Sequence, residues 1–459
     1  MATSIKRSKG SQSSLRIGTY SYWIKIATPH STSGGFQVYT NTVANDNNRG
    51  YWQYTVDGKW RMVDNDDGGT HIQLRTNRLF RDHNAWYHFV VRIDTTQATS
   101  TDRVRLYVNG VQETSFDQTD YPAQNTDLKI FEGGQTDREY MNRIYGGSAN
   151  SANWYVSHFH YCDGQSYAPT EFGQYDANGV WTIKTSPSVT YGNQGWFMFK
   201  DDASLNDDSG NSNNWSSDSG TIQKSEDNPS NVFATINPLN SSETSSTFFF
   251  TSLGNTELTA ADNDGTRQMG ITLNPENMKG YFEMKVAVDN NWQIHIQDIT
   301  RRLTKTPYDN SSNPTYTYYN AGNIRYGNGT NWTNLISSYT SASSTGDIVG
   351  VAFDFTGSNK NVWFHLNGTY GNNGSGVGNP ATGDYPALTA SNLNTADHYA
   401  FLFSVNTGGS DSSIQLNFGN GYFGTTAVAS AGTNASGIGI FEYDVPTGYT
   451  ALSTKGLNL

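Results

Sequence analysis

The chain has 459 residues, of which 13% are aromatic and only 15% are charged. Its net charge of −12 argues against a general nucleic-acid-binding protein, because such proteins present basic surfaces to the phosphate backbone. The low charge and the abundant Tyr, Phe and Trp also argue against a disordered chain, since each buried ring removes a large apolar area from water.

Cys162 is the only cysteine, so no intrachain disulfide is expected. Residues 1–30 contain no apolar run typical of a signal peptide, and no stretch reaches the ~20 apolar residues of a membrane span. We therefore expect a protein that is made in a reducing compartment, is not exported by a signal peptide and is not inserted into a membrane.

The first 45 residues are basic, with five cations and no acidic residue. Four of these cations precede the first expected strand, which begins near Tyr20; they are Lys6, Arg7, Lys9 and Arg16. Such a segment is either a solvated end or an arm that docks on an acidic partner or on a neighbouring copy of the chain.

Helical periodicity is nearly absent, and short alternating segments lie between turns rich in Gly, Asn, Asp and Pro. The first half predicts turns at Asp57-Gly58, Asn109-Gly110 and Asn178-Gly179, because these dipeptides suit two-residue hairpin loops with positive φ. Residues 86–94 (WYHFVVRID) and 153–164 (NWYVSHFHYCDG) predict further strands.

The second half begins after a polar, acidic stretch, residues 201–245, which predicts a long connection with a strand near Trp215. Residues 245–444 are again rich in predicted strands, and NVWFHLNG, from Asn361, repeats the pattern of RVRLYVNG, from Arg103. We therefore expect an all-β chain with two antiparallel β-sandwich domains of jelly-roll type in tandem. Their expected ranges are 1–222 and 223–446, followed by a tail, 447–459, that packs back.

The first domain resembles laminin G-like, concanavalin A-like sandwiches. In that family a segment W-h-H-h-x-h-x-x-D, with h for an apolar residue, precedes a hairpin h-x-h-Y-h-N-G. The residues that fit are Trp86, His88, Val90 and Asp94, then Val104, Leu106, Tyr107, Asn109 and Gly110.

The second domain resembles SPRY domains, whose well-marked strands are matched by KGYFEMKV, GDIVGVAFDF, NVWFHLNG and the closing SIQLNFG. The combination is similar to surface appendage proteins of marine, cyanophage-type bacteriophages. The phrases that carry this likeness are HYCDGQSYAPTEFGQYDANGVW, DDSGNSNNW, DNPSNVFATINPL and FEYDVPTGYTALSTKGLNL.

This resemblance implies a virion surface protein, such as a tail fibre, made in the host cytoplasm. It implies adhesion to host cell-surface polysaccharide, assembly with other proteins of the capsid, neck or tail, and a homo-oligomer such as a trimer. Two alternatives remain: a capsid or neck decoration that mainly contacts other virion proteins, and a polysaccharide depolymerase.

A depolymerase of this fold class needs two carboxylates ~5–5.5 Å apart. A Glu-x-Asp strand would supply them, because residues i and i+2 share one face of a strand. Among the predicted strands Glu283 and Asp298 stand isolated. We therefore expect no enzymatic activity.

Two sets of residues could bind a metal. His158 and His160 share one strand face, although an ordinary role in a sandwich strand explains them better. Calcium takes 6–8 oxygen ligands, and laminin G-like domains often hold one calcium ion near the glycan site. Calcium is therefore the one candidate cofactor, with a solvated turn as the alternative; its ligands would be Asp64, Asp66 and Asp67.

Carbohydrate binding by a sandwich needs aromatic faces for sugar C–H groups and amides or carboxylates for the hydroxyls. Loop aromatics are the natural candidates, whereas the adjacent pair Tyr318 and Tyr319 is interpreted as structural. The candidates are Tyr140, Tyr145, Trp154, Tyr308 and Tyr316.

Overall fold

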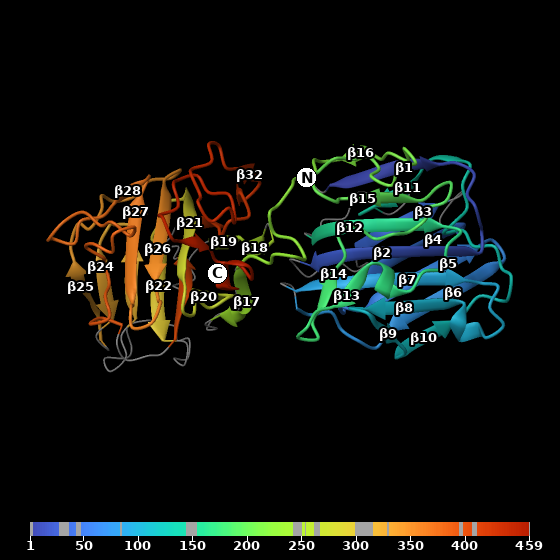
Figure 1. Cartoon of the computed structure of the whole chain (residues 1–459), viewed down its shortest axis with the longest axis horizontal. Helices are drawn as coiled ribbons and strands as arrows, with labels where there is room; N and C mark the ends of the chain where they lie inside the picture. Colours follow the sequence, from blue (N-terminus) through green and yellow to red (C-terminus); the bar gives the residue numbers. More distant parts are fainter. Residues whose placement is uncertain are drawn as a thin grey trace. The chain divides into compact units, whose positions relative to one another are not determined.

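The computed structural model describes residues 3–26, 36–42, 47–82, 85–143, 154–241, 250–252, 254–260, 267–298, 315–327, 330–393, 398–405 and 411–458. The chain divides into two compact units, Met1–Lys224 and Ser225–Leu459, close to the expected boundary after residue 222 (Figure 1). Within the described residues the regular structure is β-strand, apart from three 3₁₀ turns at Ser100–Asp102, Pro169–Glu171 and Gly456–Asn458. The all-β prediction is therefore confirmed. No helix in these residues is long and apolar enough to cross a membrane.

The first unit contains two large antiparallel sheets. The eight-stranded sheet has the order β10 (Phe116–Asp120), β6 (Gly69–Thr76), β5 (Trp60–Asp66), β4 (Arg49–Tyr54), β3 (Phe36–Thr42), β11 (Gln135–Met141), β1 (Ser4–Lys9) and β16 (Ser216–Ser219). The six-stranded sheet has the order β15 (Trp196–Met198), β12 (Trp154–Asp163), β2 (Ile17–Ile26), β7 (Trp86–Asp94), β8 (Val104–Val108) and β9 (Val111–Glu113). A small hairpin pairs β13 (Gly173–Tyr175) with β14 (Trp181–Ile183).

The core of the first unit lies between these two sheets. Strand β2 sends Tyr20, Tyr22 and Ile24 into it, as expected because alternate residues of a strand share one face. Trp52 of the opposite sheet lies with its ring centre 4.7 Å from that of Tyr20. Aromatic pairs at such distances contribute beyond their buried area, so these rings stabilise the core together with its aliphatic side chains.

The second unit also contains two large sheets. The first has the order β17 (Ile236–Ser241), β20 (Arg267–Ile271), β29 (Tyr399–Val405), β22 (Gln293–Asp298), β23 (Tyr316–Tyr319), β24 (Ile324–Gly327) and β25 (Trp332–Ile336). The second has the order β18 (Phe250–Ser252), β19 (Glu257–Ala260), β30 (Ser412–Asn417), β21 (Lys279–Val288), β26 (Ile348–Asp354), β27 (Asn361–Leu366) and β28 (Thr369–Tyr370), with β33 (Thr450–Ala451) beside β21. A short hairpin joins β31 (Tyr422–Phe423) and β32 (Thr426–Ala427).

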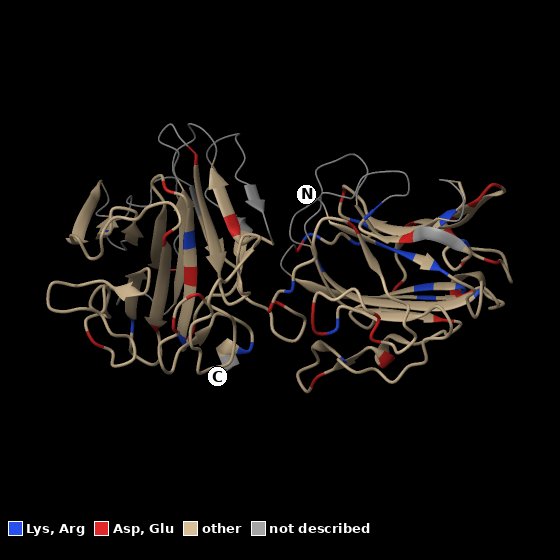
Figure 2. Cartoon of the chain, turned by 90° about the horizontal axis from the view of Figure 1, so that it is seen from above, with Lys and Arg blue, Asp and Glu red and all other residues tan. Residues whose placement is uncertain are grey.

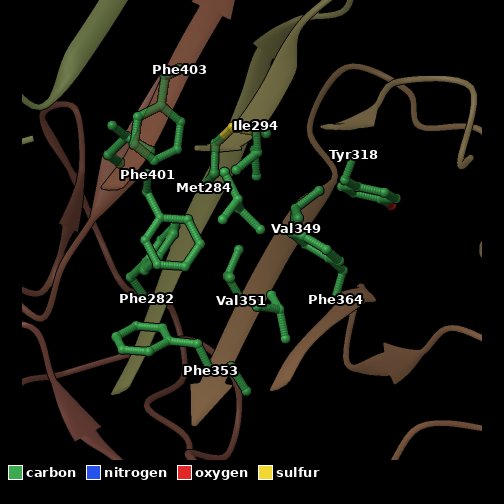
Figure 3. Close-up of a cluster of buried hydrophobic side chains, with 14 of the residues drawn as sticks. Phe282, Met284, Ile294, Tyr318, Val349, Val351, Phe353, Phe364, Phe401 and Phe403 are labelled. Atoms are coloured by element: carbon green, nitrogen blue, oxygen red, sulfur yellow. The ribbon is translucent and has the colours of Figure 1, made fainter. Parts of the chain in front are cut away.

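Side chains from both sheets meet in the core of the second unit (Figure 3). Phe282 and Met284 of β21 point toward Phe401 and Phe403 of β29, and the rings of Phe282 and Phe401 meet edge to face at 5.1 Å. Each fully buried side chain of this kind stabilises the fold by ~1.5–3 kcal/mol relative to exposure.

Two of the three predicted Asn-Gly turns are confirmed as two-residue loops with positive φ at both positions, whereas at Asn178-Gly179 only Gly179 has positive φ. Asn109 and Gly110 have φ of 48° and 79°, and Asn367 and Gly368 have φ of 50° and 81°. The Asp57-Gly58 turn differs, because only Gly58 of that pair has positive φ, and the Thr55 N–H donates to the Lys59 carbonyl at 2.8 Å. That hairpin therefore closes through a longer loop than the sequence predicts.

The polar stretch and the tail both belong to the folded units. Trp215 is buried in the first core and is followed directly by β16, which pairs with β1. At the end of the chain, the Ala234 N–H donates to the Leu452 carbonyl and the Thr454 N–H to the Val232 carbonyl, each at 2.9 Å. Residues 452–454 of the tail thus pair with residues 232–234 near the start of the second unit.

Candidate functional site

One face of the seven-stranded sheet of the second unit carries a row of polar side chains. Ile294 and Ile296 of β22 lie in the core, so His295 between them points to the opposite face. The strand register aligns one residue from each of four neighbouring strands; these are His295, Thr317, Arg325 and Asn334.

Hydrogen bonds fix the imidazole in this row. Nδ1 of His295 lies 2.8 Å from Oγ1 of Thr317, and Nε2 lies 2.8 Å from Oγ of Ser404. The ring is fully buried, with 0% of the residue exposed. The ring is therefore held in one position between β29 and β23.

Two aromatic rings contact the guanidinium of Arg325. Its Cζ lies 4.0 Å from the ring centre of Tyr319 and 4.4 Å from that of Trp332. The Trp332 ring lies nearly parallel to that of His295, at 17° and 6.2 Å between centres. We call this surface the stacked face and define it by Gln293, His295, Thr317, Tyr319, Arg325, Trp332 and Asn334.

The stacked face combines partial exposure with unpaired polar atoms. Tyr319, Arg325 and Trp332 are half-buried, and Asn334 is exposed. Gln293, the register partner of Tyr319, is only 3% exposed, and its Oε1 accepts no hydrogen bond. The Nε of Arg325 is also buried without a partner. Buried polar atoms of this kind are rare, and they call for a partner such as water or a ligand.

Burial also changes the chemistry of the cation. It lowers the pKa of Arg325 to about 10, while the nearby Tyr319 hydroxyl acts in the opposite direction. The side chain nevertheless stays charged at neutral pH.

The aromatic residues expected to bind sugar lie elsewhere. Tyr316 is wrong as a loop residue, because it begins β23 and is only 8% exposed, with its ring packed in the core. Tyr140 is buried on β11 beneath Arg143, and Trp154 is half-buried at the start of β12. Tyr145 and Tyr308 lie outside the described residues.

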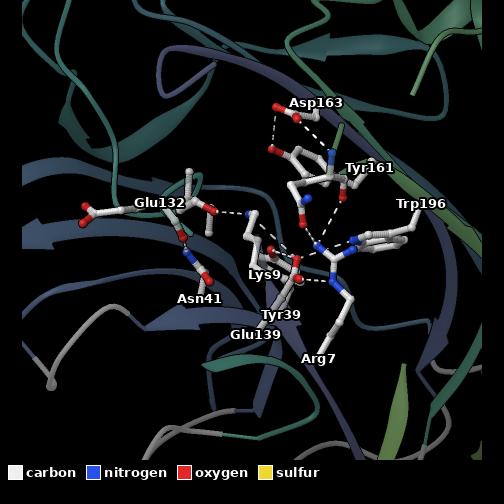
Figure 4. Close-up of polar contacts among 12 residues, drawn as sticks. Arg7, Lys9, Tyr39, Asn41, Glu132, Glu139, Tyr161, Asp163 and Trp196 are labelled. Atoms are coloured by element: carbon white, nitrogen blue, oxygen red, sulfur yellow. Dashed lines mark hydrogen bonds and ion pairs between the residues drawn. The ribbon is translucent and has the colours of Figure 1, made fainter. Parts of the chain in front are cut away.

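The basic N-terminal residues form part of the first sandwich. Arg7 and Lys9 lie on β1 and are buried, so the interpretation of these two side chains as a docking arm is wrong. Nε of Arg7 lies 2.6 Å from Oε2 of Glu139, and Nζ of Lys9 lies 3.8 Å from Oε1 (Figure 4). Lys6 on β1 is half-buried, and Arg16 forms a surface ion pair with Asp127.

Burial alone would raise the pKa of Glu139, but the two cations and the hydroxyl of Tyr39, which donates to Oε1 at 2.5 Å, together hold it below its usual value. Burial lowers the pKa of Lys9 to about 8, although the nearby charge of Glu139 acts to raise it. We call Arg7, Lys9 and Glu139 the buried charge cluster. It joins β1 to β11 between the sheets.

The turn considered for calcium is held by protein contacts. Asp64 is buried and accepts the N–H groups of Ile130 at 2.7 Å and Lys129 at 3.2 Å. His71 lies between Asp64 and Asp66, with its nitrogens 3.2 Å from an oxygen of each.

Asp67 is exposed. In the described part of the chain no group of three or more His, Cys, Asp or Glu residues is arranged to hold a metal ion. Calcium binding at this turn stays a prediction, which thermal unfolding in calcium and in EDTA can test.

His158 and His160 are separated by a β-bulge in β12. Nδ1 of His160 contacts the Tyr191 hydroxyl at 3.0 Å, and its ring stacks on Phe197 at 4.0 Å. Burial lowers the pKa of both imidazoles, to about 4 for His158. These contacts support the structural interpretation of the pair.

Glu283, the isolated carboxylate of β21, is buried under residues 442–443. Its oxygens accept the Glu442 and Tyr443 N–H groups at 2.8 Å each and the Tyr281 hydroxyl at 2.9 Å. Burial raises the pKa of Glu283 to about 7 despite these donors. The carboxylate thus anchors the covering segment to the sheet.

The sequence contained one signal for the stacked face. In QIHIQD, from Gln293, apolar and polar residues alternate, and a polar alternate face that includes His and Gln is a candidate for recognition. Arg325 and Trp332 carry no comparable local signal, because the strand pairing alone brings them together.

Comparison with known proteins identifies the fold of the first unit. Residues 7–147 match the laminin G family model described as "concanavalin A-like lectin/glucanases superfamily". This part of the chain is therefore similar to concanavalin A-like domains. No curated protein matches the sequence.

Several solved structures are similar to parts of the chain. The SPRY domain of human HERC1 is 13% identical, with 39% of this chain and 96% of that chain covered and a TM-score of 0.27. The Ruminococcus gnavus IT-sialidase CBM40 bound to α2,3-sialyllactose is 14% identical, with 33% and 88% covered and a TM-score of 0.23. The carbohydrate-binding module CBM66 from Bacillus subtilis is 8% identical, with 37% and 87% covered and a TM-score of 0.22.

Proposed function

We propose that the chain is a non-catalytic, carbohydrate-binding protein of a bacteriophage virion surface that adheres to host cell-surface glycans. The observation that carries the binding function is the stacked face, where partly exposed Tyr319 and Trp332 border a row of amides and hydroxyls. Binding sites for small ligands combine aromatic surface with a few convergent polar groups in this way.

The division of roles follows from sugar chemistry. The aromatic faces would cover C–H groups of a pyranose, and the exposed side chain of Asn334 would bond its hydroxyls. A shallow site of this kind binds weakly, so adhesion would depend on many copies in a homo-oligomer. The concanavalin A-like match of residues 7–147 supports the same class of function.

A glycan array with the purified chain tests the binding function. Trp332→Ala should lower the affinity for any bound glycan roughly tenfold, as expected for the loss of about one aromatic contact. The matched control is Tyr385→Ala, which removes a 45% exposed ring from the same unit but outside the stacked face. An equal effect of the two substitutions would argue against the stacked face as the binding site.

The virion role is a separate proposal, supported by the phage-like sequence phrases. Cryo-electron microscopy of the intact virion would test it by locating the chain. A position at the tip of a tail appendage supports adhesion, whereas a position between capsid proteins supports the decoration role. The basic N-terminal segment is weaker support for the decoration role than the sequence indicates, because Arg7 and Lys9 are buried in the first unit.

The proposal of a non-catalytic protein is supported by the state of Glu283, whose oxygens are occupied by backbone donors beneath a covering segment. Incubation of the chain with polysaccharides that it binds, followed by size-exclusion chromatography, tests this point. A fall in polymer length with time would contradict it.

A further inference from the structure

We infer that the stacked face binds acidic sugars, whose carboxylate or sulfate group pairs with the guanidinium of Arg325. This inference rests on the proposed carbohydrate-binding function and narrows it to one ligand class. It starts from the charge of Arg325 and from the contacts that this side chain makes.

The guanidinium has no acidic partner. Among the described residues, Arg325 forms neither an ion pair nor a side-chain hydrogen bond, and its contacts are the rings of Tyr319 and Trp332. Partly buried charges in folded proteins are normally paired, because removing a charge from water is costly. The part of the chain that the structure describes supplies no counterion to Arg325, although its burial calls for one.

The stacking geometry leaves the hydrogen-bond donors available. The rings lie over the guanidinium, whereas its N–H bonds lie in the guanidinium plane. The Nε–H of Arg325 is buried, so the N–H groups of the two terminal nitrogens are those that an anion would reach. A carboxylate or a sulfate can approach these groups and accept two parallel hydrogen bonds. The rings also hold the plane in one orientation, so little further ordering is needed when the anion binds.

The other groups of the stacked face are suited to the rest of the sugar. Both nitrogens of His295 contact hydroxyls of Thr317 and Ser404, so the imidazole is not available as a second anion site. Asn334, which is exposed beside Arg325 on the neighbouring strand, carries an amide that can bond a sugar hydroxyl. Tyr319 and Trp332, whose ring centres lie 4.0 and 4.4 Å from Cζ of Arg325, would cover the C–H groups of the same sugar.

Because the chain is acidic overall, a preference for acidic sugars would depend on Arg325. The chain has a net charge of −12, and few of the described residues of the second unit are Lys or Arg (Figure 2). A general attraction for acidic polymers is therefore not expected. A preference for acidic sugars would have to come from a local site, and it should disappear when that site loses its cation.

The test uses matched pairs of polysaccharides that differ only in charge. The probes are polygalacturonate with its carboxyl-reduced form and carrageenan with its desulfated form, measured by biolayer interferometry on the full-length chain. Binding to at least one acidic member, about tenfold or more tighter than to its neutral partner, is expected from the strength of charge-assisted hydrogen bonds. The two pairs distinguish a carboxylate ligand from a sulfate ligand.

Two variants and one control locate the effect. Arg325→Gln should remove the acidic preference, and Arg325→Lys should retain part of it because lysine keeps the charge but not the planar fork. Lys360→Gln also removes one cation beside a ring in the second unit, Phe355, and should leave the preference unchanged. Unfolding midpoints of all variants confirm that the sheet is intact, and Arg325→Lys keeps the test valid if Arg325→Gln fails to fold.

The outcomes separate the two proposals. Equal binding to acidic and neutral members, or an acidic preference that survives Arg325→Gln, overturns this inference while the carbohydrate-binding function stands. No binding to any of the four polysaccharides counts against the proposed function, and the inference falls with it. An acidic preference lost in Arg325→Gln and kept in Lys360→Gln supports both.

Discussion

Removing the negative charge of the buried charge cluster is predicted to destabilise the first unit strongly. In Glu139→Gln the anion disappears while Arg7 and Lys9 remain between the sheets. Lys9, whose pKa is already lowered to about 8, can give up its proton, whereas the guanidinium of Arg7 cannot. Leaving one buried charge without its partner costs ~3–5 kcal/mol.

A loss of this size is large enough to separate the unfolding of the two units. For a domain of this length, ~1 kcal/mol corresponds to ~2–4 °C, so the melting temperature of the first unit should fall by about 6–20 °C. Differential scanning calorimetry of the whole chain measures this shift. The transition of the second unit should stay in place.

Glu132→Gln is the matched control, because it breaks a partly exposed ion pair with Lys129 in the same unit. Surface pairs contribute ~0–1 kcal/mol, so this variant should melt close to the unmodified chain. The double variant Arg7→Met/Glu139→Leu removes both charges and should recover much of the stability. If Glu139→Gln melts like Glu132→Gln, the cluster does not hold β1 in the sheet.

Three further predictions concern pH and packing. Folding raises the pKa of Glu283 from 4.5 to about 7, so its contribution to stability is full below about pH 4.5. This contribution falls by about 3 kcal/mol as the pH rises to 7, and the melting temperature of the second unit should fall with it. Trp181→Ala removes a buried ring and its hydrogen bond of 2.9 Å to Nδ1 of His88, and urea unfolding should report a loss of ~3–5 kcal/mol in the first unit. Gly350→Ala would place its Cβ 1.8 Å from Nε2 of His365, and the same assay should report a loss of ~1–3 kcal/mol or more in the second unit.

Each of these has a clear contrary result. A melting temperature of the second unit that is constant or rises between pH 5 and 8 would mean that the donors around Glu283 outweigh its burial. A Trp181→Ala variant with unchanged urea midpoint would mean that the β13–β14 hairpin contributes no stability. A Gly350→Ala variant as stable as the unmodified chain would mean that His365 moves without cost.

Local features of this fold could be predicted from the sequence. The Asn109-Gly110 and Asn367-Gly368 hairpins are determined by residues adjacent in the chain, since only such dipeptides adopt positive φ at both loop positions readily. The alternation of Phe282 and Met284 with polar residues likewise marks the strand face that enters the core, whereas the burial of Glu283 on the other face comes from the distant residues 442–443.

Features that depend on strand pairing could not be predicted. Arg7 and Glu139 are 132 positions apart, so their ion pair and the burial of the basic segment are invisible to any local pattern. Tyr316 and Tyr319 belong to one strand, but the choice of which alternate residues face the core is made by the neighbouring strands β22 and β24. The stacked face was missed for this reason.

The pairing of β1 with β16 also governs how the first unit can be connected to other protein. These strands are antiparallel neighbours, with Ser4 opposite Ser219, so the chain enters and leaves this unit at one edge of one sheet. The second unit repeats the arrangement, since residues 232–234 pair with residues 452–454. A unit whose ends adjoin can be exchanged, duplicated or inserted as a cassette without rethreading its core. Tension applied through its two ends would open the terminal ladder one bond pair at a time, so grafting such units as side branches of a larger assembly would preserve them better than placing them in line.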